Sequence, residues 1–259
     1  MRYIVSLFMF ISIFGKFLSP NDPIAINLQK KLLSPSFKYF LGTDYLGRCI
    51  FSRIILGIQV TFLTALIVTI LSALLGMCLG VIAGNCNRRI ENIIIRITDI
   101  FDSFPSIIIV LLIVNIMGSS AFSLGLSLLL VSWTNYSRIS RNLTKELMSS
   151  EFIIMSTLLN KPKWRILKED LIPNITPQIM IVAFNSFAGV ILSLAGYSFL
   201  GFGVRAPYSE LGMMINEGKD YIYSRPELMI GPGVVIFIMV ISVNLLGNEI
   251  KNQYEIIKD

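Results

Sequence analysis

The feature that most constrains this chain is the number and length of its apolar stretches. Six hydrophobic segments can be drawn, at about residues 3–18, 58–83, 93–117, 122–136, 175–200 and 228–246. Hydrophobic residues make up 54% of the 259 residues and charged residues only 15%, whereas soluble proteins have about 45–50% and about 25%. Because a helix needs about 20 apolar residues to cross a bilayer, the sequence predicts an integral membrane protein with about six transmembrane helices.

The apolar runs show no strand-like alternation, so the expected fold is all-α. No internal repeat or low-complexity tail is visible, and residues 1–259 are expected to form a single transmembrane domain. The first segment could also be a secretory signal, with Arg2 as its basic start. No small-x-small cleavage site follows it, which favours an uncleaved first span.

Composition also excludes several kinds of chemistry. The chain has no histidine, which is the commonest general base and metal ligand in proteins. The three cysteines show no C-x-x-C spacing, and no G-x-x-x-x-G-K-[ST] phosphate loop occurs. We therefore expect no catalytic residue, metal site or bound cofactor in this chain. The net charge of +6 is attributed to basic cytoplasmic loops and not to a nucleic-acid partner.

Two features inside the apolar segments predict how helices meet. Gly76, Gly80 and Gly84 are spaced by four, which would let two helices approach closely, although a merely glycine-rich helix is an alternative. Asp99 and Asp102 share a helical face with Arg96, and Pro105 is expected to bend or restart that helix. The two aspartates either line a substrate path or form a solvated face or a salt bridge to Arg96.

A long basic loop, at about residues 142–174, separates the fourth and fifth apolar segments. It contains an amphipathic stretch from Glu151 to Asn160, and a short apolar helix at a membrane face needs a partner to cover it. The stretch resembles the EAA loop of ABC-importer permeases. Glu151 matches the Glu of that pattern, Met155 and Ser156 take the place of the small pair, and Ile172-Pro173-Asn174 closes the loop.

Asn160 stands where that pattern usually has Gly. Asn is the second-best residue in the left-handed conformation that ends many helices, so Asn160 is expected to form such a cap. A second resemblance lies in Leu41-Gly-Thr-Asp-Tyr-Leu-Gly-Arg48, which is similar to the LGTD-x-x-GRD signature of dipeptide, oligopeptide and nickel permeases. Cys49 replaces the final Asp of that signature.

Two further matches extend the resemblance to about residue 251. Residues 198–214 are similar to the SFLGLG-x-x-x-P-x-x-x-WG run of the same family, with Leu211 in place of Trp. Residues 244–251 are similar to its NLLGD-x-LRD ending. The chain is thereby identified as resembling the permease subunit of a binding-protein-dependent ABC importer with a type I-like helix bundle.

The resemblance implies partners that this chain must meet. They are a second homologous permease, two cytosolic ATPase subunits that bind ATP and Mg²⁺, and an extracellular solute-binding protein, all around a bilayer. The cargo would be short peptides, nickel or another metal chelate, and the location would be a bacterial cell membrane with both termini in the cytoplasm. The uncharged turn at residues 118–123 and the basic turn at Arg88-Arg89 support this orientation.

The expected site residues fall into three groups. The residues expected to couple to the ATPases are Glu151, Phe152, Met155, Ser156, Leu159, Asn160 and Pro173. The side chains expected to bury in an ATPase cleft are Phe152, Ile153, Met155, Leu158 and Leu159. Those expected to fix the register at its rim are Glu151, Lys161, Lys163 and Arg165.

The outer loop is expected to close the mouth of the path through Gly42, Thr43, Asp44, Gly47 and Arg48, with Asp44 paired to Arg48 or Arg53. The expected substrate-path residues are Trp133, Asn135 and Asn185.

Two other function classes are compatible with a membrane bundle. An ion-coupled transporter or channel would call for conspicuous acidic residues at mid-membrane or for paired broken helices, and the mid-span regions are almost free of carboxylates. A membrane enzyme with a Ser-His pair or an H-E-x-x-H motif is excluded because histidine is absent.

Overall fold

The computed structural model describes residues 2–205 and 207–258, and this part of the chain is helical apart from loops and an isolated bridge between Thr43 and Cys49. The α-helices are α1 (Arg2–Leu18), α2 (Ile50–Asn85), α3 (Arg88–Ser103), α4 (Ser106–Met117), α5 (Ala121–Met148), α6 (Glu151–Leu158), α7 (Lys163–Arg165), α8 (Ile172–Tyr197), α9 (Leu211–Gly218) and α10 (Glu227–Lys258). Single turns of other helix types are η1 (Leu28–Lys30), η2 (Ile166–Leu171), η3 (Ser198–Phe202) and η4 (Lys219–Tyr221). The all-α expectation is confirmed.

Within the described residues, three helices are long and apolar enough to cross a membrane: α2, a continuous run from Lys163 to Phe202 that contains α8, and α10. Helices α3 and α4 meet the same test only as a pair, with a bend of 85° between them. Helix α1 is a shorter apolar helix, and the apolar part of α5 is its first half. The expected start of the second span was too late, because α2 continues through the polar residues Ser52 and Arg53 that hydropathy alone assigns to a loop.

The bend between α3 and α4 lies where the sequence predicted it. Phe104 ends α3 in an extended conformation, with φ −93° and ψ 133°, and Pro105 precedes the first turn of α4. The ring of a proline disfavours a helical conformation in the preceding residue, which is why the helix stops here.

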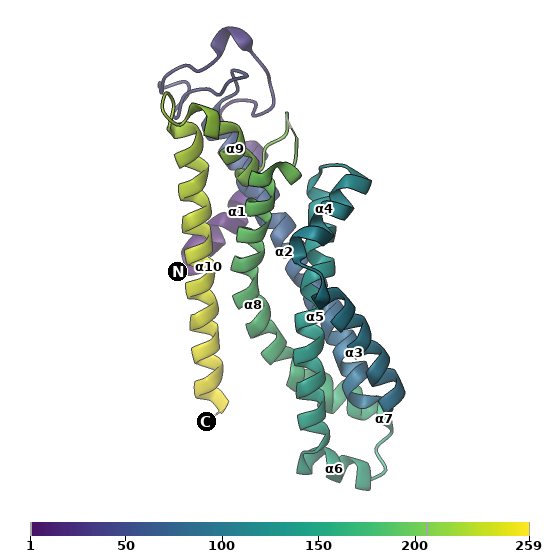
Figure 1. Ribbon diagram of the computed structural model, residues 1–259. Coiled ribbons are helices and arrows are strands. Elements are labelled where there is room, and N and C mark those ends of the chain that lie inside the picture. Colours follow the sequence, from purple (N-terminus) through teal and green to yellow (C-terminus); the bar gives the residue numbers. More distant parts are fainter. Residues whose placement is uncertain (1, 206, 259) are drawn as a thin grey trace.

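Helices α2 and α5 run against each other along most of their length (Figure 1). The glycines of α2 allow this approach, because a Cβ on Gly80 would lie 2.4 Å from the carbonyl oxygen of Ser137 and one on Gly76 would lie 2.5 Å from that of Trp133. A Cβ on Gly84 would similarly lie 2.5 Å from the Cβ of Thr144. The close helix contact predicted from the spacing is confirmed.

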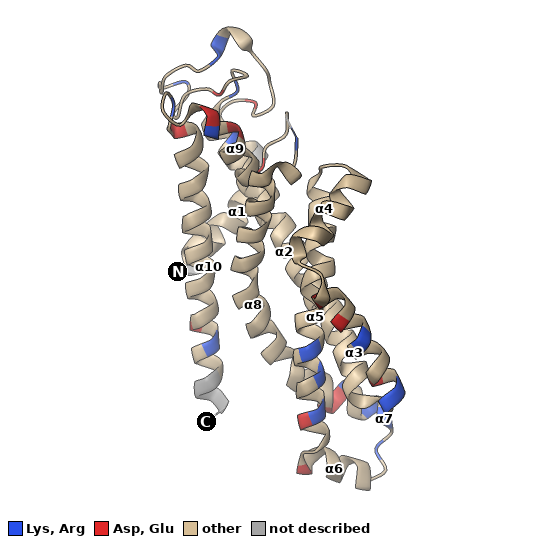
Figure 2. Ribbon diagram, in the orientation of Figure 1, with Lys and Arg blue, Asp and Glu red and all other residues tan. Residues whose placement is uncertain are grey.

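The molecule is elongated, with different structures at its two ends (Figure 1). The loop between α1 and α2 lies at one end beside α9, and α6 lies at the other end with the C-terminus of α10. Charged residues gather towards these ends, whereas α8 carries none (Figure 2). A bilayer requires this distribution, because charged side chains are costly in its hydrocarbon interior.

Candidate functional site

Helix α6 exposes most of its apolar side chains. Phe152, Met155 and Leu158 are exposed, and Leu159 directly after the helix has 78% of its surface free. Among the residues of α6 only Ile153 is buried, with 1% exposed. Ile153 was expected to bury in a partner, and this was wrong. It belongs to a buried cluster with Ile166 and Leu171 of the same chain, because an eight-residue helix needs one face to hold it against its own protein.

Asn160 adopts the conformation that the sequence predicted. Its φ angle is +55°, in the left-handed region, and the amide of Lys161 donates to the carbonyl oxygen of Ser156 at 3.1 Å. Pro162 follows at the position where prolines often follow helix caps. The end of α6 is therefore a defined turn, from which the chain continues through α7 into η2.

Lys161 ties this turn to the rest of the protein. Its Nζ donates to both carboxylate oxygens of Asp170 at 2.7 Å and lies 3.2 Å from Glu169. The hydrogen bond to Asp170 raises the pKa of Lys161 above its usual value. Lys161 was expected at a rim facing a partner, but its ammonium group is engaged within the chain.

The remaining loop residues present a mixed surface. Trp164 is exposed beside Arg165, whose guanidinium carbon lies 5.4 Å from the ring centroid. Glu151 is exposed and Ser156 is half-buried, while Pro173 lies at the start of α8. Sequence reasoning did not single out Trp164, although an exposed tryptophan in a polar loop is the kind of residue that anchors partners.

Ion pairs join α3 to α5 above this loop. Arg138 Nη2 lies 2.8 Å from Asp99 Oδ1 and 2.7 Å from Asp102 Oδ2. Nearer to α6, Glu91 pairs with Arg141 and with Lys145. Of the alternatives for the two aspartates, the solvated face agrees with their exposed side chains. The alternative salt bridge to Arg96 is replaced by one to Arg138, because α3 packs against α5.

The three expected path residues occupy different environments. Trp133 is buried and packs edge-to-face on Phe101, with ring centroids 5.6 Å apart. Asn135 on α5 is exposed, and Asn185 on α8 is exposed beside Gly247 of α10. The structure thus places Trp133 in the packing between α3 and α5 and not on an open surface.

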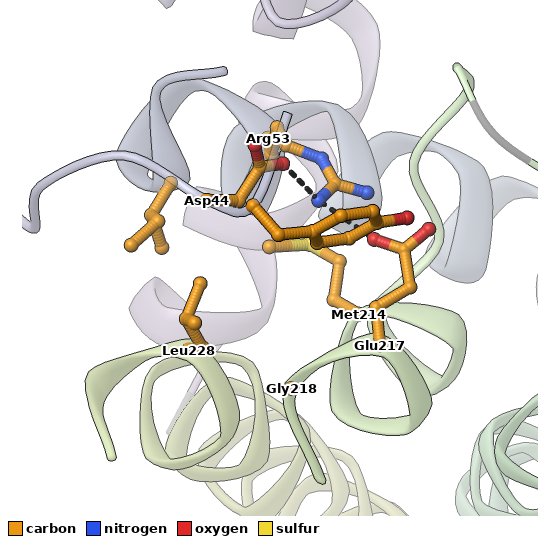
Figure 3. A pocket seen from close by; sticks show the side chains of 8 residues that line it. Asp44, Arg53, Met214, Glu217, Gly218 and Leu228 are labelled. Atoms are coloured by element: carbon orange, nitrogen blue, oxygen red, sulfur yellow. Dashed lines mark hydrogen bonds and ion pairs between the residues drawn. The ribbon is translucent and has the colours of Figure 1, made fainter. Parts of the chain in front are cut away.

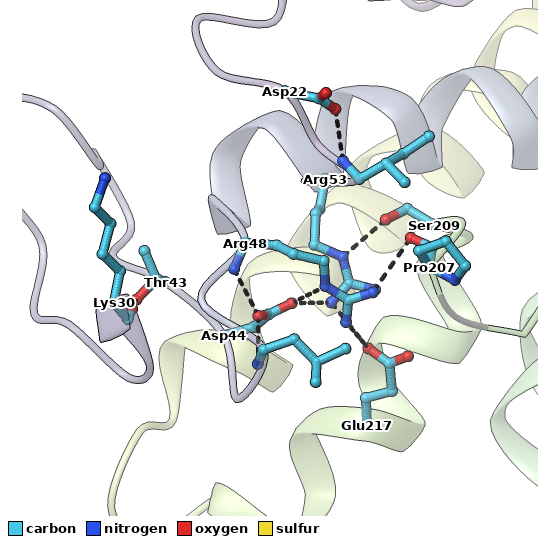
Figure 4. Close-up of polar contacts among 11 residues, drawn as sticks. Asp22, Lys30, Thr43, Asp44, Arg48, Arg53, Pro207, Ser209 and Glu217 are labelled. Atoms are coloured by element: carbon cyan, nitrogen blue, oxygen red, sulfur yellow. Dashed lines mark hydrogen bonds and ion pairs between the residues drawn. The ribbon is translucent and has the colours of Figure 1, made fainter. Parts of the chain in front are cut away.

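The opposite end contains a buried cluster of charges (Figure 4). Asp44 accepts hydrogen bonds from Arg48 Nε and Arg53 Nη1, each at 2.6 Å, so both alternative pairings of Asp44 are present. Glu217 of α9 lies 3.1 Å from Arg48 Nη2 and 2.8 Å from Arg53 Nη1. The cluster joins the start of α2 to α9 with two charges of each sign.

The other members of the outer signature shape the backbone around this cluster. Gly42 and Gly47 have φ angles of +79° and +76°, which side chains with a Cβ rarely adopt. The Thr43 hydroxyl accepts from the Leu33 amide at 2.8 Å. The tight turns expected around Thr43 and Asp44 are confirmed.

A cavity of about 10 Å³, close to the size of one water, adjoins the charges between Asp44, Arg53, Met214, Glu217 and Leu228 (Figure 3).

Glu217 was not recognised from the sequence. The available signal was an acidic residue at the end of a mostly apolar run from Leu211. Ser209, which accepts from Arg53 Nε at 2.8 Å, was also missed.

A second buried carboxylate, Glu210, was likewise missed. It caps α9 by accepting from the amides of Gly212 and Met213 at 3.0 Å, and the Thr61 hydroxyl of α2 donates to it at 3.0 Å. Burial raises the pKa of Glu210, and the hydrogen bonds from the first amides of α9 and from Thr61 partly offset this rise. Two buried carboxylates therefore join α9 to α2: Glu217 through Arg53, and Glu210 through Thr61.

Comparison with known proteins is consistent with these features. Residues 76–252 match the family described as binding-protein-dependent transport system inner membrane component. The chain is 33% identical over 252 residues to the nickel transport system permease protein NikC of Escherichia coli, covering 97% of this chain and 91% of that protein. It is 32% identical over 248 residues to the metal-staphylopine import system permease protein CntC of Staphylococcus aureus, covering 96% and 86%.

The fold agrees with a solved structure as well. A chain of the MetNI methionine ABC transporter in inward-facing conformations superposes with a TM-score of 0.62 at 18% identity, covering 76% of this chain and 94% of that chain. The protein therefore belongs to the integral inner-membrane permeases of binding-protein-dependent ABC importers, within the dipeptide, oligopeptide and nickel class.

Proposed function

We propose that this permease pairs with a second, homologous permease to import nickel or another metal as a chelate. The observation that carries this proposal is the similarity, over almost the whole chain, to permeases named for nickel and for metal-staphylopine import. The absence of histidine favours a chelate over a bare ion, because imidazole is the usual ligand for nickel-like metals. An extracellular solute-binding protein would deliver the cargo.

We further propose that α6 docks into a cytosolic ATPase subunit that binds ATP and Mg²⁺. Four exposed side chains form an apolar surface on α6 and directly after it: Phe152, Met155, Leu158 and Leu159. The buried side chain of Ile153 holds the helix against its own protein. Such a surface is costly in water and is typical of a helix that fits a partner's groove. Glu151, Lys163 and Arg165 would then lie at the edge of the contact.

The contacts of α5 with α6, α2 and α3 support the proposal that a movement of α6 is transmitted to the rest of the helix bundle. Only Ser149 and Ser150 separate α5 from α6, so a displaced α6 pulls directly on α5. The glycine contacts fix α5 to α2, and the ion pairs of Glu91 and Arg138 fix it to α3. These helices would therefore move together, and the break at Pro105 would absorb the change.

This arrangement also sets the proposed orientation. With α6 in the cytoplasm, the C-terminal end of α10 lies on the same side of the membrane (Figure 1). We further propose a cytoplasmic N-terminus, and a position at the outer mouth for the charge cluster of Asp44 and Glu217. Asn135 and Asn185 remain proposed path residues, because their exposed amides would face the second permease.

The test replaces Met155 and Leu159 by Asp in the assembled importer. Copurification of the ATPase subunits should be lost while membrane insertion and the second permease are retained, because two charges would enter an apolar contact. Lys168→Asp serves as the control, since Lys168 is exposed on the same loop outside this surface. Unchanged copurification with the double variant would refute the docking assignment.

The cargo is tested separately with the importer in liposomes. Uptake of radioactive nickel with its chelator should depend on ATP and the binding protein, and an excess of dipeptides should not compete. Uptake of labelled dipeptides instead would overturn the metal assignment and leave the coupling assignment standing.

A further inference from the structure

A long apolar groove runs between four helices, α1, α2, α8 and α10. Its volume is about 440 Å³, and on its α2 side it extends from Phe62 to Met77. On its α8 side it extends from Thr176 to Phe187. The residues proposed for coupling, for the charge cluster and for the substrate path do not line it, so the groove needs an explanation of its own.

The groove offers almost no polar group to a ligand. Among the described residues that line it, Thr69 and Thr176 carry the polar side-chain groups. The Thr69 hydroxyl donates to the carbonyl oxygen of Ala65 at 2.8 Å, and the Thr176 hydroxyl donates to that of Ile172 at 2.7 Å. Both hydroxyls are thus satisfied within their own helices. A charged or hydrated ligand would lose its water here without gaining a partner, so the groove suits an apolar ligand only.

The groove has about the depth of one leaflet of a bilayer. At a rise of about 1.5 Å per residue, its α8 side is about 17 Å long and its α2 side about 22 Å. Half of the hydrocarbon core of a bilayer is about 15 Å thick. One end of the groove lies near the start of α8, close to the exposed Asn174 and on the side of α6 (Figure 1). The groove therefore runs from the membrane surface on the α6 side towards the bilayer centre.

An aromatic pair closes the deep end of the groove. Phe62 of α2 and Phe187 of α8 are buried, and their rings meet edge-to-face with centroids 5.2 Å apart. Beyond them, Ile58 and Ile191 belong to the same buried cluster. Met180, which also lines the groove, is 54% exposed. A long apolar ligand could therefore enter sideways from the bilayer, but it could not pass through the molecule.

Water and a protein helix are poor occupants of this groove. A buried water needs about 2–4 polar partners, and a groove left empty would lose van der Waals contacts along its walls. A helix about 10 Å wide would take up about 1,300 Å³ over the length of the α8 side, about three times the volume of the groove. A single acyl chain is unbranched, flexible and much narrower, and the surrounding bilayer supplies it.

We propose that this groove binds one acyl chain of a membrane phospholipid. The methyl end of the chain lies against Phe62 and Phe187, and the headgroup stays at the membrane surface near Asn174. Four helices contact the chain, so it contributes to the packing of the bundle, which in a membrane depends on such contacts. The assignment of the chain to the cytoplasmic leaflet rests on the proposed orientation, whereas the groove and the class of its ligand do not.

The test uses the complete importer, with both permeases and both ATPases, in nanodiscs of phosphatidylethanolamine and phosphatidylglycerol. A small share of the phospholipid carries a photoreactive diazirine near the methyl end of one acyl chain. After illumination, the labelled residues are mapped by mass spectrometry. We expect labelling around Ile70 and Phe184, which line the groove, to exceed several-fold that around Ile238 and Ile241, which are exposed on α10 outside it.

Filling the groove provides a second measurement. Ala183 lines the groove, so Ala183→Trp should displace the chain and lower the labelling of the groove several-fold. Met180→Trp, at an exposed lining position, fills the groove with less risk to folding and should act in the same direction. Val234→Trp is the matched control, because Val234 is exposed on α10 outside the groove, and it should leave the labelling unchanged. Copurification of the second permease and the ATPases checks that each variant assembles.

Two results would overturn the proposal. Labelling of the groove no stronger than that of α10 would show that only ordinary bilayer lipid passes over it. Absent lipid labelling, together with crosslinking of a Met180→Cys variant to the second permease, would show that protein covers the groove. Neither result would affect the proposed import function, because ATP-dependent uptake of the metal chelate is measured separately.

Discussion

The two ends of this permease are stabilised in opposite ways. At the outer end, two arginines and two carboxylates are buried together and satisfy one another within the chain. At the α6 end, apolar side chains face water, and Ile153 together with the Lys161–Asp170 pair holds the helix in place. The charge cluster is satisfied within the single chain, whereas the apolar side chains of α6 have no cover within it and would be covered by the docking proposed above.

From this difference we infer that the charge cluster contributes mainly to folding stability and that the exposed surface of α6 contributes mainly to coupling. Removing one member of a buried ion cluster leaves the others uncompensated, which costs folding free energy. Changing an exposed apolar side chain costs little in the isolated chain and has its effect when the partner binds. Substitutions at the two ends should therefore separate into folding defects and transport defects.

The largest expected effect is that of Asp44→Ala. This change leaves Arg48 and Arg53 buried with only Glu217, and breaking such a cluster costs about 3–5 kcal/mol. Thermal unfolding of the detergent-purified importer should show a marked loss of stability, or the yield should collapse. Asp22→Ala, at an exposed position between α1 and α2, removes only an exposed hydrogen bond from the Ile24 amide and should have a much smaller effect. Equal stability of the two variants would contradict a stabilising role for the buried charge cluster.

An intermediate effect is expected at Asn160, where the backbone has a positive φ angle. Asn160→Pro cannot adopt this conformation, so the turn after α6 should be displaced and transport should uncouple from ATP hydrolysis. Asn160→Gly should preserve both, because Gly is the preferred residue for this conformation. ATPase activity and metal uptake are measured together in liposomes, and normal coupled uptake by the Pro variant would contradict the importance of this cap.

The smallest effect on stability is expected for Arg138→Ala. Its ion pairs with Asp99 and Asp102 are exposed, and such pairs contribute about 0–1 kcal/mol. If α3 and α5 move together, the variant should hydrolyse ATP normally but transport fewer metal chelates per ATP. Arg96→Ala, on the same helix as the aspartates, should keep the normal ratio. If Arg138→Ala transports the normal number of metal chelates per ATP, this ion pair does not transmit the movement of α6.

Local sequence rules predicted the backbone of the candidate site well. The break at Pro105, the left-handed Asn160 and the turns at Gly42 and Gly47 all follow from the φ and ψ preferences of single residues. The close contact of α2 with α5 followed from the spacing of the glycines. These features need no knowledge of distant parts of the chain.

The choice of side-chain partners was less predictable. Arg96 and Arg138 have the same chemistry, and only the packing of α3 on α5 selects Arg138 for Asp99 and Asp102. The inward direction of Ile153 depends on where η2 lies, and the burial of Trp133 depends on Phe101. Glu217 joins Arg48 from a position 169 residues away along the chain.

The sequence by itself determined that this protein is a helical membrane bundle with a family-specific loop at each end, because apolar length and backbone preferences are local properties. The tertiary structure decided which charges are buried together and which apolar side chains remain uncovered. The physical reason is that burial and ion pairing depend on distances between helices, and those distances are fixed only when the helices pack.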